Sequence, residues 1–72
     1  MKTVTQGDTG IALITAKITM RSGRELWMCN PYSLLAEALL DGEPFEADTV
    51  EGMQPKQIMI NPAHVATIER EL

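Results

Sequence analysis

Residues 14–29, ITAKITMRSGRELWMC, carry the clearest secondary-structure pattern of the sequence. The first half of this stretch alternates apolar and polar residues with a period of two, as a half-buried strand does. The apolar set is Ile14, Ala16, Ile18 and Met20, and the polar set is Thr15, Lys17, Thr19 and Arg21. Gly23 lies in the following turn, residues 21–24, where a tight hairpin needs a residue that can adopt a positive φ. The stretch therefore predicts a β-hairpin.

The second arm of this hairpin, residues 26–29, is apolar on both of its faces. One face needs the core as cover, and the other needs a helix or another subunit. A chain of 72 residues buries only about 60% of its unfolded surface, so it often relies on association for stability. We therefore predict a homo-oligomer with Leu26, Trp27 and Met28 at its interface.

Residues 31–41 carry the pattern of an amphipathic helix. The apolar residues that share its inner face are Pro31, Leu34, Leu35, Ala38 and Leu39. Asn30 and Pro31 predict the start of the helix, because asparagine caps free backbone N–H groups and proline suits the first helical position. Gly42 predicts its end in the left-handed conformation.

Three shorter elements are expected after the helix. Residues 45–49 alternate apolar with acidic side chains and predict a strand with an acidic outer face. A turn is expected over residues 52–56, which contain Pro55, and a short apolar strand over residues 57–60.

An Asn-Pro pair occurs twice after an expected apolar strand, as Asn30-Pro31 and as Asn61-Pro62. In both places an asparagine able to bond its own following backbone precedes a proline that fixes the turn. One tight helical turn is expected over residues 62–64. The segment 65–72 fits a strand, with Arg70 out of place, or a helix, and its β-branched residues favour the strand.

Together these patterns predict one small α+β domain over residues 11–72, preceded by a flexible polar arm over residues 1–10. The domain is expected to hold an antiparallel sheet of about four strands, curled or barrel-like, with one short helix against it.

Two runs of sequence resemble known small β proteins. INPAHVATIE, residues 60–69, resembles the closing corner of Sm-like and SH3-like small barrels, and SGRELWMCNP, residues 22–31, is similar to the hairpin of a short β protein encoded among flagellar genes. The Sm-like resemblance implies ring oligomers and often RNA binding. The helix over residues 31–41 departs from both families. The residues with which such rings hold RNA are not recognisable here, so the resemblance supplies no site residue.

Charge favours a protein partner over nucleic acid or a membrane. Six basic and ten acidic side chains give a formal net charge of −4, which opposes binding to phosphates. No basic residue occurs between Arg24 and Lys56, and we predict an acidic partner-binding face formed by Glu43, Glu46 and Asp48. No window approaches the ~20 apolar residues of a membrane span, so no membrane contact is expected.

The residue types needed for catalysis or metal binding are scarce. His64 is the only histidine and Cys29 the only cysteine, which excludes an intrachain disulfide, a serine triad and a multi-histidine metal site within one chain. Cys29 and His64 could meet as a nucleophile and its base, but a buried cysteine and a surface histidine are the commoner arrangement. We predict no enzyme activity, no metal and no cofactor, and the lone thiol fits a cytoplasmic location.

Two functions remain after these exclusions. The favoured function is a non-enzymatic accessory or regulatory interaction module that self-associates and binds a protein partner through its apolar strand and acidic face. The alternative is a ring-forming, Sm-like binder of RNA or of a nucleotide ligand, with a site between subunits near Asn61 and His64. Trp27 fits either the anchor of the core or the hot spot of an interface.

Overall fold

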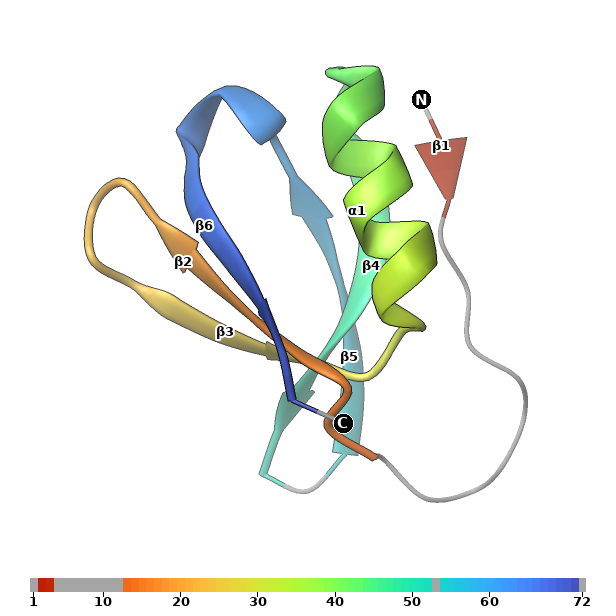
Figure 1. Cartoon of the computed structure of the whole chain (residues 1–72). Coiled ribbons are helices and arrows are strands. Elements are labelled where there is room, and N and C mark those ends of the chain that lie inside the picture. The colour runs from red at the N-terminus through yellow and green to blue at the C-terminus, as the bar shows by residue number, and fades with distance from the viewer. Residues whose placement is uncertain (1, 4–12, 53, 72) are drawn as a thin grey trace.

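The computed structural model describes residues 2–3, 13–52 and 54–71. In chain order the elements are β1 (Lys2–Thr3), β2 (Ala16–Met20), β3 (Glu25–Met28), α1 (Tyr32–Asp41), β4 (Phe45–Glu51), β5 (Gln54–Ile60), the 3-10 turn η1 (Pro62–His64) and β6 (Val65–Arg70) (Figure 1). Of the arm predicted over residues 1–10, only β1 belongs to the described residues, and it pairs in parallel with the start of β4.

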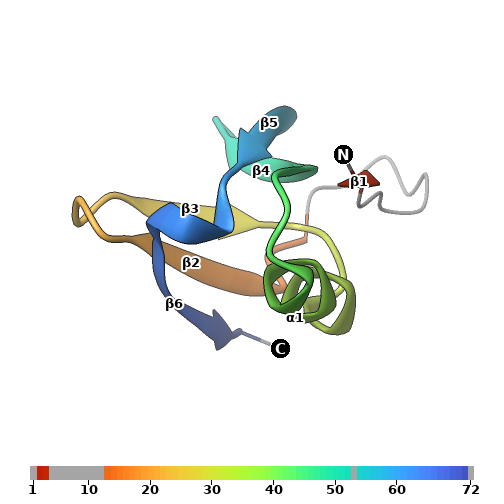
Figure 2. The ribbon, with the colours of Figure 1, turned by 90° about the horizontal axis from the view of Figure 1, so that it is seen from above.

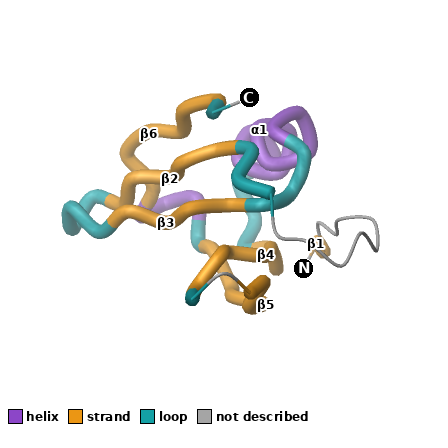
Figure 3. Tube along the Cα trace, turned by 90° about the horizontal axis from the view of Figure 1, so that it is seen from below, coloured by secondary structure: helices purple, strands orange, loops and turns teal. Residues whose placement is uncertain are grey.

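The five strands β2 to β6 form an antiparallel sheet in the order β5-β4-β3-β2-β6. Seen from above and from below, β4 and β5 lie on one side of the β2–β3 hairpin and β6 lies on the other (Figures 2 and 3). The sheet is open, because β5 pairs only with β4 and β6 only with β2 among the described residues. The α+β class is confirmed. The sheet has five antiparallel strands rather than about four, and the sequence pattern had left the last one, β6, open between strand and helix.

The β2–β3 hairpin has the alternation that its sequence predicts. Ile18 pairs with Leu26 and Ala16 with Met28, and all four side chains are buried. In the turn, Gly23 adopts a φ of 95° and its N–H donates to the carbonyl oxygen of Met20 at 2.9 Å. The hairpin is confirmed, with its first strand beginning at Ala16.

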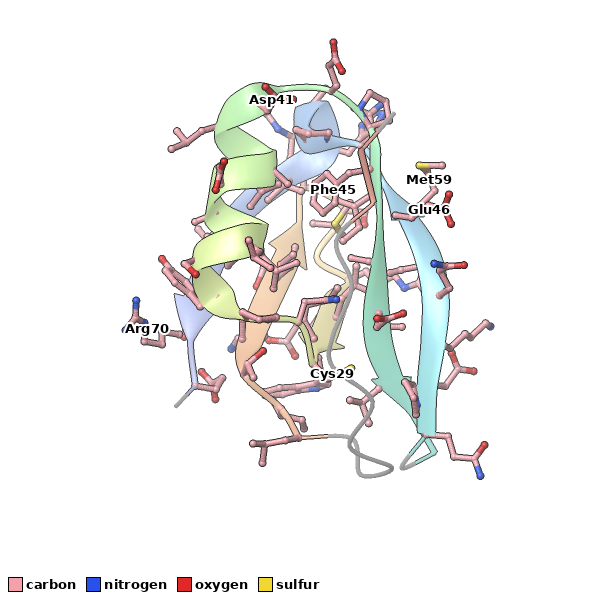
Figure 4. The ribbon with its side chains drawn as sticks, turned by 90° about the vertical axis from the view of Figure 1, so that its right-hand side faces the viewer. Cys29, Asp41, Phe45, Glu46, Met59 and Arg70 are labelled. Atoms are coloured by element: carbon pink, nitrogen blue, oxygen red, sulfur yellow. The ribbon has the colours of Figure 1, made fainter. Side chains whose placement is uncertain are left out.

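The hydrophobic core lies between α1 and the inner face of the sheet. Its fully or nearly fully buried members are Ala16, Ile18, Leu26, Met28, Leu35, Ala38, Phe45, Ala47 and Ile60. Phe45 is the largest of them and lies between α1 and β4 (Figure 4). Removing such a buried aromatic ring costs about 3–5 kcal/mol of folding free energy, so Phe45 contributes strongly to the stability of this core.

Helix α1 ends as predicted but begins differently. Gly42 has a φ of 83° and its N–H donates to the carbonyl oxygen of Leu39 at 3.2 Å, which is a left-handed C-cap. Pro31 stands at the N-cap position, and no side chain caps the helix. The prediction that Asn30 caps it is wrong, because the buried Asn30 carboxamide bonds to Asp48 of β4 instead.

The turn predicted over residues 52–56 is shorter than expected, since β5 already begins at Gln54 and includes Pro55. The carbonyl of Asp48 accepts the N–H of Cys29 on the β3 side of β4, so the backbone groups of Thr49 point toward β5, where Thr49 pairs with Lys56. Successive residues of a strand point their backbone groups to opposite sides. The nitrogen of Pro55 therefore faces away from β4, and its missing N–H costs no sheet hydrogen bond.

The chain returns from β5 to β6 through the predicted tight turn. The Asn61 carboxamide oxygen accepts the N–H of Ala63 at 3.1 Å, and Pro62–His64 form η1. Strand β6 then pairs with β2, with Ile68 opposite Ile18. The strand alternative for this segment is confirmed.

Candidate functional site

The side of the sheet that faces away from α1 carries an exposed tryptophan. Alternation along β3 buries Leu26 (7% exposed) and Met28 (0%) and leaves Trp27 38% exposed. Lys17 of β2 pairs with Trp27, and Glu69 of β6 pairs with Lys17, so the three side chains form a row across this outer face. Of the predicted interface trio, only Trp27 reaches the surface, and Leu26 and Met28 belong to the core.

Lys17 joins this row to a second carboxylate. Its Nζ lies 3.3 Å from Glu25 Oε2, 3.9 Å from Glu69 Oε1 and 5.6 Å from the centre of the Trp27 ring. The hydrogen bond to Glu25, together with the charge of Glu69, raises the pKa of Lys17 above its ordinary value of 10.5. We name Lys17, Glu25, Trp27 and Glu69 the Trp27 cluster. It holds one ammonium between two carboxylates beside an aromatic ring.

The predicted acidic face is divided between two environments. Glu43 is exposed in the connection between α1 and β4, whereas Glu46 and Asp48 are half-buried on the outer face of β4. Glu46 lies opposite Met59 of β5, and both side chains point away from α1 (Figure 4). Glu46 therefore remains available at the surface beside an apolar neighbour.

Asp48 has a structural task in the same face. Its carboxylate accepts the Asn30 amide at 3.2 Å, and its backbone N–H donates to the Asn30 carboxamide oxygen at 2.7 Å. Its backbone carbonyl accepts both the N–H and the thiol of Cys29. Asp48 thus links the end of β3 to β4.

Asn61 and His64 are the residues predicted as an alternative ligand site. Asn61 directly precedes η1, His64 is the last residue of η1, and both are exposed. The Asn61 carboxamide oxygen is engaged by Ala63 N–H, and the carbonyl oxygen of His64 accepts the N–H of Arg21 at 2.8 Å. The structure therefore places this pair beside the β2–β3 turn.

Cys29 lies at the other end of the hairpin from that turn, so the structure does not bring it together with His64. Its thiol is buried, and burial together with the charge of Asp48 raises its pKa above the ordinary value of 9.0. A thiol of this kind is a poor nucleophile. Within the described residues, no three or more histidine, cysteine or carboxylate side chains group to hold a metal ion.

Sequence reasoning missed a cleft at the start of α1. It has a volume of about 250 Å³ and is lined by Thr15, Pro31, Tyr32, Ser33 and Arg70. Arg70, the residue that did not fit the strand pattern, lies with its guanidinium carbon 4.6 Å from the centre of the Tyr32 ring. The poor fit of Arg70 to the strand pattern was the feature of the sequence that could have indicated this contact. The contact attaches the end of β6 to α1.

Among the described residues, the two outer strands of the sheet each have one edge that no other strand pairs with. On β5, the backbone N–H and C=O groups of Gln57 and Met59 point away from β4, to the same side as those of Pro55. On β6, Glu71 N–H donates to the carbonyl oxygen of Thr15 at 2.9 Å, so the groups of Ile68 and Arg70 point away from β2. Both edges of the described sheet can therefore accept another strand.

No protein-family model, curated protein or solved structure matches this chain. In the part of the chain that the structure describes, no helix is long and apolar enough to cross a membrane.

Proposed function

We propose that the protein is a non-enzymatic interaction module that self-associates through its sheet edges and binds a protein partner on its outer face. The observation that carries this proposal is the open sheet, whose β5 and β6 edges both lack a neighbouring strand among the described residues. An unpaired edge is a template for another strand. In a chain with so small a core, pairing with a second copy adds the buried surface that the fold itself cannot supply.

The edge of β5 is protected at its beginning and open at its end. Pro55 and Lys56 are residues of the kind that discourage strand addition, and the Lys56 ammonium lies 3.5 Å from Glu51. Beyond them, Gln57 and Met59 offer backbone groups, and Met59 is 52% exposed. We therefore assign the self-pairing segment to the second half of β5, and its partner strand to β6 of another copy.

The two outer strands, β5 and β6, follow each other in the chain but lie on opposite sides of the sheet. Strands β2, β3 and β4 each pair with the next strand in the chain, although α1 stands between β3 and β4 in sequence. After a tight turn, β6 pairs with β2. Pairing β5 of one copy with β6 of the next joins two different surfaces, and such contacts build rings or filaments. The RNA-binding alternative would share this assembly, so oligomeric state alone does not separate the two functions.

The test uses a proline on the free side of β5. Met59→Pro removes an N–H that points away from β4, so it leaves the β4–β5 ladder intact and blocks strand addition. We expect multi-angle light scattering to give an oligomer for the unmodified protein and for Met59→Ala, and the 7.9 kDa monomer for Met59→Pro.

Met59→Lys is the second variant, because it keeps the backbone N–H and adds the charge that edge strands use against pairing. It should weaken association without unfolding the chain, as followed by circular dichroism. Unchanged oligomers in both the proline and the lysine variants would contradict pairing through β5.

A further inference from the structure

The outer face of the sheet combines apolar side chains with an excess of carboxylates. Strand alternation places Glu25, Glu46, Asp48 and Glu69 on this face. Among the described residues of β2 to β6, Lys17 is the one cationic side chain that alternation places there, since Lys56 and Arg70 lie at inward positions. Val50 shares the face with Trp27, because Thr49 pairs with the inward Met28, and Pro55 lies opposite Val50. An aromatic and aliphatic centre is thus surrounded by negative charge.

The Trp27 cluster already shows how this face holds a cation. The Lys17 ammonium lies within 4 Å of two carboxylates and 5.6 Å from the ring centre, an arrangement in which ring and carboxylates attract the same positive charge. Glu25 and Glu69 are more than half exposed at their side chains. Two carboxylates on one ammonium leave one negative charge uncompensated, so the cluster has capacity for a second cation.

We propose that the outer face binds a basic segment of a partner protein, with an arginine or lysine seated over Trp27 between Glu25 and Glu69 and an apolar neighbour on Val50 and Pro55. This inference rests on the proposed function and names the chemistry of its partner. Charge complementarity favours such a segment, because opposite potentials steer the partners together and like charges exclude acidic ones. The same carboxylates repel a phosphate backbone.

The probe is a synthetic peptide in which arginine alternates with valine, and its matched control replaces each arginine by glutamate. Trp27 is the only tryptophan of the chain, so its fluorescence reports directly on the proposed contact. We expect a saturable fluorescence change with the basic peptide that weakens as salt is added, and none with the acidic peptide. Equal responses to both peptides, or none to either, would overturn the inference.

Removing the cluster carboxylates should weaken binding. We expect the double variant Glu25→Gln, Glu69→Gln to bind the basic peptide about fivefold more weakly than the unmodified protein does. The double variant Glu37→Gln, Glu51→Gln is the matched control, because it removes the same two charges from exposed positions on α1 and at the end of β4, and it should bind as the unmodified protein does. An equal loss in both variants would show a dependence on net charge alone and would contradict a site at Trp27.

Removing Lys17 should have the opposite effect. Lys17→Met frees the ring and both carboxylates from their internal cation, so we expect the basic peptide to bind several-fold more tightly. Lys56→Met is the control, since it removes the same charge from the net total but lies away from the cluster. No gain in Lys17→Met beyond that of Lys56→Met would sink the proposal.

Native mass keeps this inference separable from the proposed self-association. If the protein is an oligomer but does not bind the basic peptide, the proposal of a basic partner segment is refuted and self-association stands. A monomer that binds the peptide at Trp27 would refute self-association and leave the partner chemistry standing.

Discussion

At the scale of single residues, the two Asn-Pro pairs show that the same dipeptide can contribute unequally to the stability of the fold. Asn30 is fully buried and exchanges two hydrogen bonds with Asp48, whereas the exposed Asn61 accepts one from the backbone of its own turn. A buried hydrogen-bonding group that loses its partner costs far more than an exposed one. Only Asn30 therefore links distant parts of the chain.

This difference predicts unequal stability losses. Asn30→Ala leaves the Asp48 N–H and carboxylate without their partner and should lower the free energy of unfolding by about 1–3 kcal/mol. Asn61→Ala, the matched control, should cost about 0.5–1 kcal/mol, as the loss of a local cap does. Urea denaturation followed by circular dichroism measures both, and equal losses would contradict a central role for the Asn30–Asp48 contact.

Cys29 gives the protein a prediction at alkaline pH. Because burial raises the pKa of its thiol, the folded state holds the proton more tightly than the unfolded state does. The stability linked to the protonated thiol is fully present below pH 9.0 and is lost as pH rises through the raised pKa. Urea midpoints should therefore fall above pH 9 and fall less in Cys29→Ala. Parallel declines in the two proteins would assign the effect to other groups such as Lys17, whose raised pKa acts in the same direction.

At the scale of elements, Gly42 sets the direction in which the chain leaves α1. Its φ of 83° is costly for a residue with a Cβ, so Gly42→Ala should destabilise the fold by about 1–2 kcal/mol. Gly42→Asn should cost less, because asparagine adopts the left-handed conformation more readily. Thermal unfolding compares the two variants, and equal losses would show that the conformation is not the cause.

Local patterns predicted most of the elements, and long-range contacts decided the exceptions. The alternation in β2, the apolar stripe of α1 and the C-cap at Gly42 are all local patterns. The hairpin and α1 could therefore be predicted from the sequence alone. Asn30 bonds to a residue 18 positions away, and Pro55 is tolerated only because β5 has one neighbour. The Trp27 cluster depends on the pairing of β6 with β2, which the ambiguous pattern over residues 65–72 could not supply.

At the scale of the whole molecule, the negative net charge and the carboxylates of the outer face lead to a prediction about nucleic acid. We expect no saturable binding of fluorescently labelled single-stranded RNA at physiological salt in an anisotropy titration. A salt-sensitive complex at micromolar concentration, lost when Lys17, Arg21 and Arg24 are changed to alanine, would instead support the RNA-binding alternative.

The proposed self-association is supported by the open sheet and the small core together. The most direct test is the molar mass of the unmodified protein by light scattering across a range of micromolar concentrations. We predict a mass that is a multiple of 7.9 kDa and decreases toward 7.9 kDa only on dilution. A mass of 7.9 kDa at every concentration would contradict the claim.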